Sequence, residues 1–101
     1  MNQPKLRLIR SKIGGCSSFD ALCREFPDVN PSELSALWDV RNAYNVQSLR
    51  AMTELSQARF AERYGFSQRS VESWEGGQRS IPDYLLDFLA ADIISSVKGQ
   101  D

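Results

Sequence analysis

The sequence has no histidine and only two cysteines among its 101 residues. Histidine-based catalytic triads are therefore close to excluded, as are zinc sites, which take most of their ligands from these two residue types. Cys16 and Cys23 lie seven residues apart and lack the C-x-x-C spacing of many metal and redox sites. We expect both to pack as small apolar side chains in a reduced core, with a redox pair as the alternative. No metal, no cofactor and no enzymatic activity are expected.

Long apolar runs are missing too. None approaches the roughly 20 residues that span a bilayer, and the first five residues, MNQPK, lack the apolar stretch of a secretory signal. We therefore expect a cytoplasmic protein with no membrane partner. Hydrophobic residues make up 42% of the chain and charged residues 25%, which is typical of a folded globular protein. The length predicts one compact domain.

An excess of one charge is absent as well. The 12 basic and 13 acidic side chains leave a net charge of −1, which excludes a uniformly basic surface for nucleic acid or membrane. Residues 1–15 carry four basic side chains and no acid, and residues 41–80 carry six arginines against four glutamates. Residues 16–40 and 81–101 are acidic. Because the local field governs polyanion binding, only the first two stretches are candidates to face phosphates, and ordinary solvated surface is the alternative.

The first 45 residues predict three short elements. Residues 5–13 fit neither the helix nor the strand period cleanly, so we expect a short strand or a helical turn, ended by the two glycines that follow. Ser18 is a candidate N-cap for a short helix stopped by Pro27. Residues 30–33, NPSE, mark another helix start with Asn30 as the candidate N-cap, and the apolar spacing continues that helix to about Ala43.

The remainder of the chain predicts short helices over residues 46–52, 57–64 and 68–75, and a fourth from residue 82 onward. Ser56 and Ser67 are candidate N-caps, and Gly65 can adopt the left-handed conformation that ends a helix. The inner face expected for 57–64 consists of Ala58, Phe60, Ala61 and Tyr64. The apolar stripe expected for the last helix consists of Tyr84, Leu85, Phe88, Leu89, Asp92, Ile93, Ser96 and Val97. The predicted fold class is all-α.

Residues 55–77, LSQARFAERYGFSQRSVESWEGG, resemble the helix-turn-helix of lambda-repressor-like (XRE, Cro-type) transcription regulators. The resemblance covers about residues 46–90. It implies a lambda-repressor-like DNA-binding bundle over residues 46–97, preceded by a mostly helical N-terminal extension, 1–45, and followed by a tail, 98–101. Ala61 is small where two helices of such a motif cross at a steep angle.

The resemblance implies that the helix over residues 68–75 reads DNA bases. Val71 and Trp74 anchor it, which leaves its polar side chains pointing outward. The first, second and sixth positions of this helix commonly touch base edges in the family, and they correspond to Gln68, Arg69 and Ser73. Glutamine can pair with adenine and arginine with guanine. Glu72 is expected to face a neighbouring arginine, with acceptance from a cytosine amine as the alternative.

Phosphate contacts are implied on both sides of this helix. Gln57 begins the preceding helix, where exposed amides and the helix dipole favour an anion, and its side chain can also brace Gln68. The loop after the reading helix offers backbone amides, a guanidinium and a hydroxyl. The implied phosphate-contacting residues are Gln57, Ser70, Gly77, Gln78, Arg79 and Ser80. The family often has asparagine where this chain has Gly76, which puts one side-chain contact in doubt. Arg59 and Arg63 add positive field.

Arg50 and Glu75 match family positions that form a buried ion pair between the first and third helices of the motif. The implied function is sequence-specific binding of double-stranded DNA as a transcriptional regulator, most simply a repressor that binds a pseudo-palindromic operator as a homodimer.

The extension, residues 1–45, has three possible uses. It is a dimerisation element, a basic arm that touches DNA (Lys5, Arg7, Arg10 and Lys12), or a surface that binds a protein such as a toxin, as in antitoxins that resemble this family. The apolar stripe near the C-terminus is a second candidate dimer seam. Two other functions remain open: an antitoxin that autoregulates its operon, and a helix-turn-helix used only for protein contact.

Overall fold

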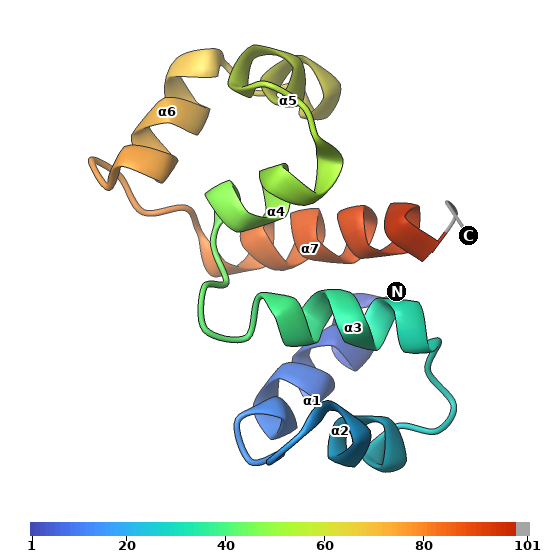
Figure 1. The fold of residues 1–101 in the computed structure, drawn as a ribbon. Helices are drawn as coiled ribbons and strands as arrows, with labels where there is room; N and C mark the ends of the chain where they lie inside the picture. Colours follow the sequence, from blue (N-terminus) through green and yellow to red (C-terminus); the bar gives the residue numbers. More distant parts are fainter. Residues whose placement is uncertain (99–101) are drawn as a thin grey trace.

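The computed structural model describes residues 1–98, and in this part the backbone forms seven helices and no strand (Figure 1). The all-α expectation is confirmed for these residues. Of the predicted tail, Lys98 belongs to the last helix, whereas residues 99–101 and the side chain of Val97 lie outside the described part. The helices are α1 (Gln3–Ile13), α2 (Phe19–Glu25), α3 (Pro31–Asp39), α4 (Val46–Thr53), α5 (Gln57–Tyr64), α6 (Gln68–Gly76) and α7 (Asp83–Lys98).

Each of the first six helices begins at a polar side chain that accepts a hydrogen bond from a backbone amide of its own first turn. These N-caps are Asn2, Ser18, Asn30, Asn45, Ser56 and Ser67. The four caps expected from the sequence are confirmed, while Asn2 and Asn45 are caps that the pattern did not predict. Such caps satisfy amides that have no partner inside the helix, so they define where these short helices start.

Residues 5–13 belong to a full helix, α1, so the expectation of a strand or a single helical turn is wrong. Leu6, Ile9 and Ile13 follow a helical spacing and are buried. Leu8 lies between them and remains 45% exposed. Because Leu8 is apolar yet faces solvent, the helical spacing of the buried residues is hard to see in the sequence. In the structure the side chain of Asn2 caps this helix and defines its start.

One helix end and one buried face also differ from expectation. Helix α3 ends at Asp39 instead of near Ala43, because the amides of Arg41 and Ala43 bond in tight turns to Trp38 and Val40. These turns bring the chain to the cap of α4. In α5, Ala58 is exposed, so the buried face consists of Phe60 and Ala61, with Tyr64 half-buried.

Helix α7 runs through the middle of the molecule, with α1 and α3 on one side and α4 on the other (Figure 1). Because neighbours cover it on more than one side, it buries Leu86, Ala90 and Ile94 in addition to the expected Leu89 and Ile93. The first aromatic residues of the expected stripe are instead at the surface, Tyr84 at 67% and Phe88 at 49% exposure. A single stripe was the wrong pattern for a central helix.

The extension and the helix-turn-helix segment contribute to one hydrophobic cluster. Leu6 of α1 and Leu37 of α3 belong to it together with Leu49 of α4, Phe60 of α5 and Leu89 of α7. The two cysteines are free thiols, half-buried against this cluster. Within residues 1–98 no helix combines the length and apolar character that a bilayer crossing requires.

Candidate functional site

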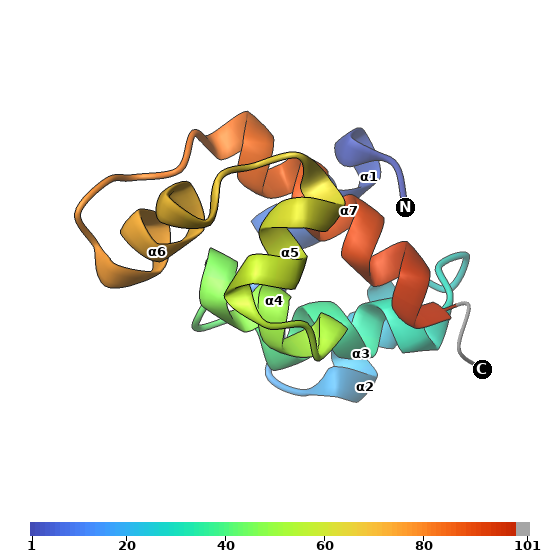
Figure 2. The same ribbon diagram turned by 90° about the horizontal axis from the view of Figure 1, so that it is seen from above.

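Helices α5 and α6 form a tight helix-turn-helix at one end of the molecule, where α6 lies at the periphery in both views (Figures 1 and 2). Gly65 ends α5 in the left-handed conformation, with φ of +77°, and its amide bonds back to carbonyls of the last turn. Ser67 then caps α6 two residues later. The sequence could place this turn because glycine alone adopts that backbone conformation without a Cβ penalty.

Apolar contacts fix α6 on its inner side. Val71 is fully buried, and Trp74 meets the ring of Phe66 edge-on at 5.1 Å between centroids. Phe66 in turn stacks near Tyr64. A nine-residue helix has little stability alone, so these contacts and the cap hold α6 in place.

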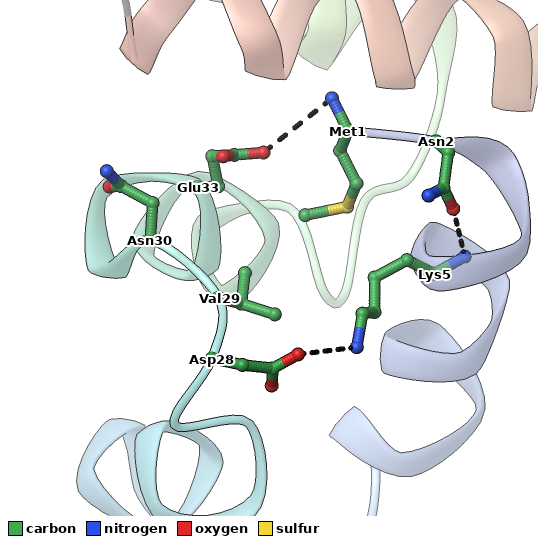
Figure 3. A pocket seen from close by; sticks show the side chains of 7 residues that line it. All are labelled: Met1, Asn2, Lys5, Asp28, Val29, Asn30 and Glu33. Carbon is green, nitrogen blue, oxygen red and sulfur yellow. Dashed lines mark hydrogen bonds and ion pairs between the residues drawn. The ribbon is translucent and has the colours of Figure 1, made fainter.

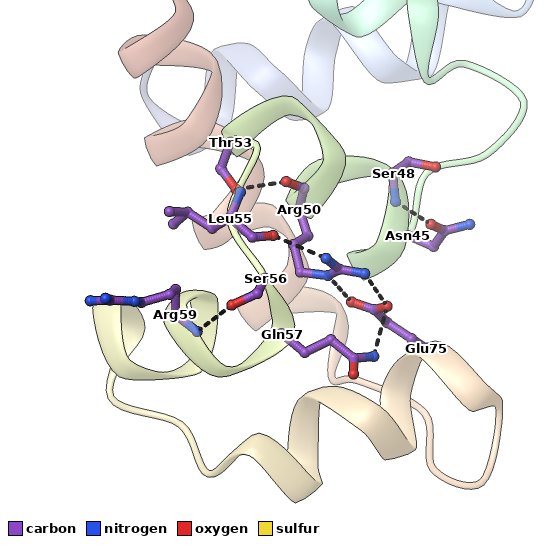
Figure 4. Close-up of polar contacts among 9 residues, drawn as sticks. All are labelled: Asn45, Ser48, Arg50, Thr53, Leu55, Ser56, Gln57, Arg59 and Glu75. Atoms are coloured by element: carbon purple, nitrogen blue, oxygen red, sulfur yellow. Dashed lines mark hydrogen bonds and ion pairs between the residues drawn. The ribbon is translucent and has the colours of Figure 1, made fainter.

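A polar cluster ties α6 to α4 and α5 (Figure 4). The Arg50 guanidinium binds the Glu75 carboxylate with two hydrogen bonds, Nε to Oε2 at 2.6 Å and Nη2 to Oε1 at 2.9 Å, and donates a third to the Leu55 carbonyl. The side chains of Arg50 and Glu75 are 21% and 7% exposed. Hydrogen bonds from Arg50 hold the pKa of Glu75 below its usual value, with a smaller effect from Gln57.

Gln57 takes part in this cluster, since its Nε2 donates to Oε1 of Glu75 at 3.2 Å. The expected bracing of Gln68 by Gln57 is therefore replaced by a bond to Glu75. Gln68 itself donates from Nε2 to Oε1 of Glu72 at 3.1 Å. We also expected Glu72 to face an arginine. Its hydrogen-bonding neighbour is instead Gln68, one helical turn earlier.

The outward side of α6 is polar and accessible. Gln68, Arg69 and Glu72 are exposed, whereas Ser70 and Ser73 are half-buried. The three residues that the resemblance assigns to base reading thus share one helix, with Ser73 less accessible than the other two. No described contact occupies the guanidinium of Arg69.

A small cavity of about 280 Å³ lies beside the first turns of α6. Its lining brings together two arginines and three serine hydroxyls, namely Ser67, Arg69, Ser70, Ser73 and Arg79. Nη2 of Arg79 donates to Oγ of Ser70 at 2.9 Å, and Oγ of Ser67 donates to the same oxygen at 3.0 Å. Guanidinium and hydroxyl groups around a cavity of this size suit a single phosphate group.

The loop after α6 differs from expectation in one respect. The backbone amides of Gly77, Gln78 and Arg79 all donate to the carbonyl of Ser73, so they are not free for a phosphate. The side chains of Gln78, Arg79 and Ser80 remain exposed. A Cβ built on Gly76 would lie 2.5 Å from Oε1 of Gln78, so an asparagine at this position would require that flexible side chain to move.

The distribution of ion pairs leaves α5, α6 and the following loop with unpaired basic groups. Within residues 1–98 the ion pairs are Met1–Glu33, Lys5–Asp28, Arg7–Asp87, Lys12–Glu25 and Arg50–Glu75. None of them uses Arg59, Arg63, Arg69 or Arg79. Seven arginines have no ion pair within residues 1–98, and these four of them lie in α5, α6 and the following loop, together with the unpaired acids Glu62 and Glu72.

The basic residues of the predicted N-terminal arm are held by contacts within the molecule. Lys5, Arg7 and Lys12 each pair with an acid, and the guanidinium of Arg10 lies 3.5 Å from the ring centroid of Tyr44. Tyr44 donates to Asp87 at 2.6 Å, and burial, with that carboxylate, raises its pKa. These contacts fasten α1 to α2, α7 and the loops, so this segment is a packed helix and not an extended arm.

A larger cavity, of about 450 Å³, lies between α1 and the start of α3 (Figure 3). Two ion pairs cross it, Lys5 to Asp28 at 3.0 Å and the amino group of Met1 to Glu33 at 3.8 Å. Basic and acidic groups balance there, which does not favour a polyanion. In the part of the chain that the structure describes, no group of three potential metal-ligating side chains comes together.

The geometry thus singles out the accessible side of α6, with the adjoining arginine-lined cavity, as the candidate site. No protein family, curated protein or solved structure matches this chain.

Proposed function

We propose that this protein binds double-stranded DNA in a sequence-specific manner and regulates transcription, with α6 inserted in the major groove. A single observation carries the proposal. The Arg50–Glu75 pair holds the inner side of α6, while the accessible side of α6 is polar and flanked by arginines without an ion pair. A groove reader needs both features, because base discrimination requires a rigid helix and phosphates require positive charge nearby.

The parts of the site would divide this work. Gln68, Arg69 and Ser73 would meet base edges, and Arg79 with Ser70 would hold a phosphate at the small cavity. The same DNA backbone would be met by the Ser80 hydroxyl, the Gln78 side chain and the N-terminal end of α5 at Gln57. Arg59 and Arg63 would add attraction without direct contact.

We further propose a homodimer on a pseudo-palindromic operator, most simply as a repressor. Among the leucines and isoleucines of α1 and α3, only Leu8, at 45%, is exposed, and the others belong to this molecule's own core, which leaves little of the extension to act as a dimer seam. Tyr84 and Phe88, one turn apart and exposed, remain available on α7. Binding to two half-sites requires a dimer with its two α6 helices about 34 Å apart, one turn of DNA.

The antitoxin alternative requires an accessible binding surface on residues 1–45. Leu6, Ile9, Leu34 and Leu37, which are among the largest apolar side chains of this segment, are buried in the core. This arrangement favours DNA binding over toxin binding as the main activity.

The test is selection of bound sites from random duplex DNA, followed by titrations at several salt concentrations. Arg69→Ala is expected to weaken binding at the selected site by about 1–3 kcal/mol and to relax the preference at one base pair. Arg79→Ala is expected to weaken all sequences alike and to lower the salt slope by about one.

Arg24→Ala is the matched control. Arg24 is an exposed arginine on α2, at the opposite end of the molecule from α6, with no ion pair within residues 1–98, so its removal should change neither quantity (Figure 1). Failure of the wild-type protein to retard any duplex at low salt would refute DNA binding. Mass measurement of the free protein and of the complex tests the dimer.

A further inference from the structure

Gln68 and Glu72 form a hydrogen-bonded pair on the accessible side of α6. Nε2 of Gln68 donates to Oε1 of Glu72 at 3.1 Å, and both side chains are exposed. No basic group lies within ion-pair distance of the Glu72 carboxylate in the described residues. The pair therefore keeps two unengaged oxygens, one from the amide and one from the carboxylate, and carries a negative charge.

This arrangement changes what Gln68 can present to a base. A free glutamine offers a donor and an acceptor together, which matches adenine N6 and N7. Once one N–H of its amide is taken by Glu72, the pair presents one remaining N–H against two acceptor oxygens, so acceptors predominate. They suit the donor with the fewest acceptors beside it, and in the major groove this describes the cytosine N4 amine. Cytosine N4 has a C–H group on one side and the O6 of its paired guanine on the other, whereas adenine N6 lies between two acceptors.

We propose, on the basis of the DNA-binding function proposed above, that Gln68 and Glu72 act as one acceptor unit and that Glu72 is a specificity-determining residue that selects cytosine. Guanine O6 and N7 and thymine O4 are acceptors, so the carboxylate repels them. Adenine N7 is repelled in the same way beside its N6 amine. Arg79 at the phosphate and the positive charge of Arg69 beside it supply the attraction to DNA that allows a carboxylate to enter the groove.

The experiment compares sites selected from random duplex DNA by the wild-type protein and three variants. Gln68→Ala identifies the base pair that this end of α6 reads. At that position we expect the wild-type protein to prefer cytosine by about fivefold or more over each other base. Glu72→Ala frees the amide nitrogen of Gln68, so the cytosine preference should fall to about twofold or less, with adenine gaining most.

Glu62→Ala is the matched control, because Glu62 is an exposed glutamate of α5 with no ion pair within residues 1–98. It removes the same charge near the DNA and should raise affinity for all sites without changing the cytosine preference. Thermal melting of each variant, expected to match the wild-type protein, shows that folding is retained.

The outcomes separate this inference from the function on which it rests. A wild-type preference for adenine, guanine or thymine at the position identified, or a cytosine preference unchanged by Glu72→Ala, would overturn the role of Glu72 while DNA binding stands. An equal loss of preference in Glu62→Ala would also overturn it, because a general charge effect would explain the result. No binding to any duplex would overturn both proposals.

Discussion

At the scale of single residues, the arrangement around Glu75 makes the stability of the protein depend on one carboxylate. Its carboxylate accepts from Arg50 and from Gln57 and is 7% exposed, so a charged group is held away from water by partners from two other helices. A buried ion pair of this kind contributes little relative to apolar packing, yet removal of one partner leaves the other without compensation. The positions in the sequence, 25 residues apart, suggested the pair only through the resemblance.

We predict that Glu75→Ala destabilises the protein far more than Gln68→Ala. The first change strands the Arg50 guanidinium and should cost about 3 kcal/mol, since that group is partly accessible to water. The second removes only an exposed side chain and should stay within about 0.5 kcal/mol of the wild-type value. Urea unfolding of both variants measures the difference, and equal midpoints would contradict a structural role for the pair.

The same pair predicts a dependence of stability on pH. Hydrogen bonds from Arg50 lower the pKa of Glu75 in the folded protein, so the folded state binds this proton less readily than the unfolded state. The stabilisation is complete above about pH 5 and is lost as the pH falls through the lowered value. We expect the gap in unfolding free energy between the wild-type protein and Glu75→Gln to be constant from pH 6 to 8 and to shrink below about pH 4. A gap independent of pH would show that Glu75 is not held as a carboxylate.

At the scale of elements, most helices could be predicted because their signals are local. Ser56, Gly65 and Ser67 set the bounds of α5 and the start of α6 by capping chemistry that involves only near neighbours. Helix α1 has a local cap as well, at Asn2, but because Leu8 is exposed its apolar spacing alone does not separate the residues packed against α7 from the outer ones. The end of α3 depended on turns that no residue pattern announced.

The residue that ends α4 allows a prediction about a single helix boundary. Glu54 caps it in the left-handed conformation, with φ of +61°, where a side chain costs about 1–2 kcal/mol. Glycine removes that cost but loses more conformational freedom on folding, so Glu54→Gly should stabilise by about 0.5–1 kcal/mol. Thermal melting gives the sign. Glu62→Gly, the same replacement inside α5, should instead destabilise by about 1 kcal/mol, and a similar response of both variants would contradict the argument.

At the scale of the whole molecule, the extension and the helix-turn-helix segment share one core through α7. Leu34 and Leu37 of α3 belong to the same buried cluster as Phe60 of α5 and Val71 of α6. Disruption of either part should therefore weaken the other. The division of the chain at residue 45 that the resemblance implies remains a prediction about function, not a boundary between two cores.

The two tryptophans allow this shared core to be tested, because Trp38 lies in α3 and Trp74 in α6. In Trp74→Phe, fluorescence reports on the extension, and in Trp38→Phe it reports on the helix-turn-helix. We expect fluorescence and helical circular dichroism to unfold with the same midpoint within each variant, as a two-state domain does. Leu37→Ala, a fully buried change, should lower the midpoints reported by both probes by the equivalent of about 2–5 kcal/mol. Transitions that separate, or a shift at Trp38 alone, would indicate two independent units.

The sequence by itself determined the helical class, four of the six N-caps, the turn at Gly65 and the polar side of α6, because caps, glycine conformations and helical spacing act over a few residues. Only the tertiary structure decided that α7 buries more than one face and that three basic groups of α1 are neutralised by Asp28, Asp87 and Glu25. Ion pairing and burial depend on groups distant in the chain, and a local pattern carries no record of which of several nearby partners a side chain will meet.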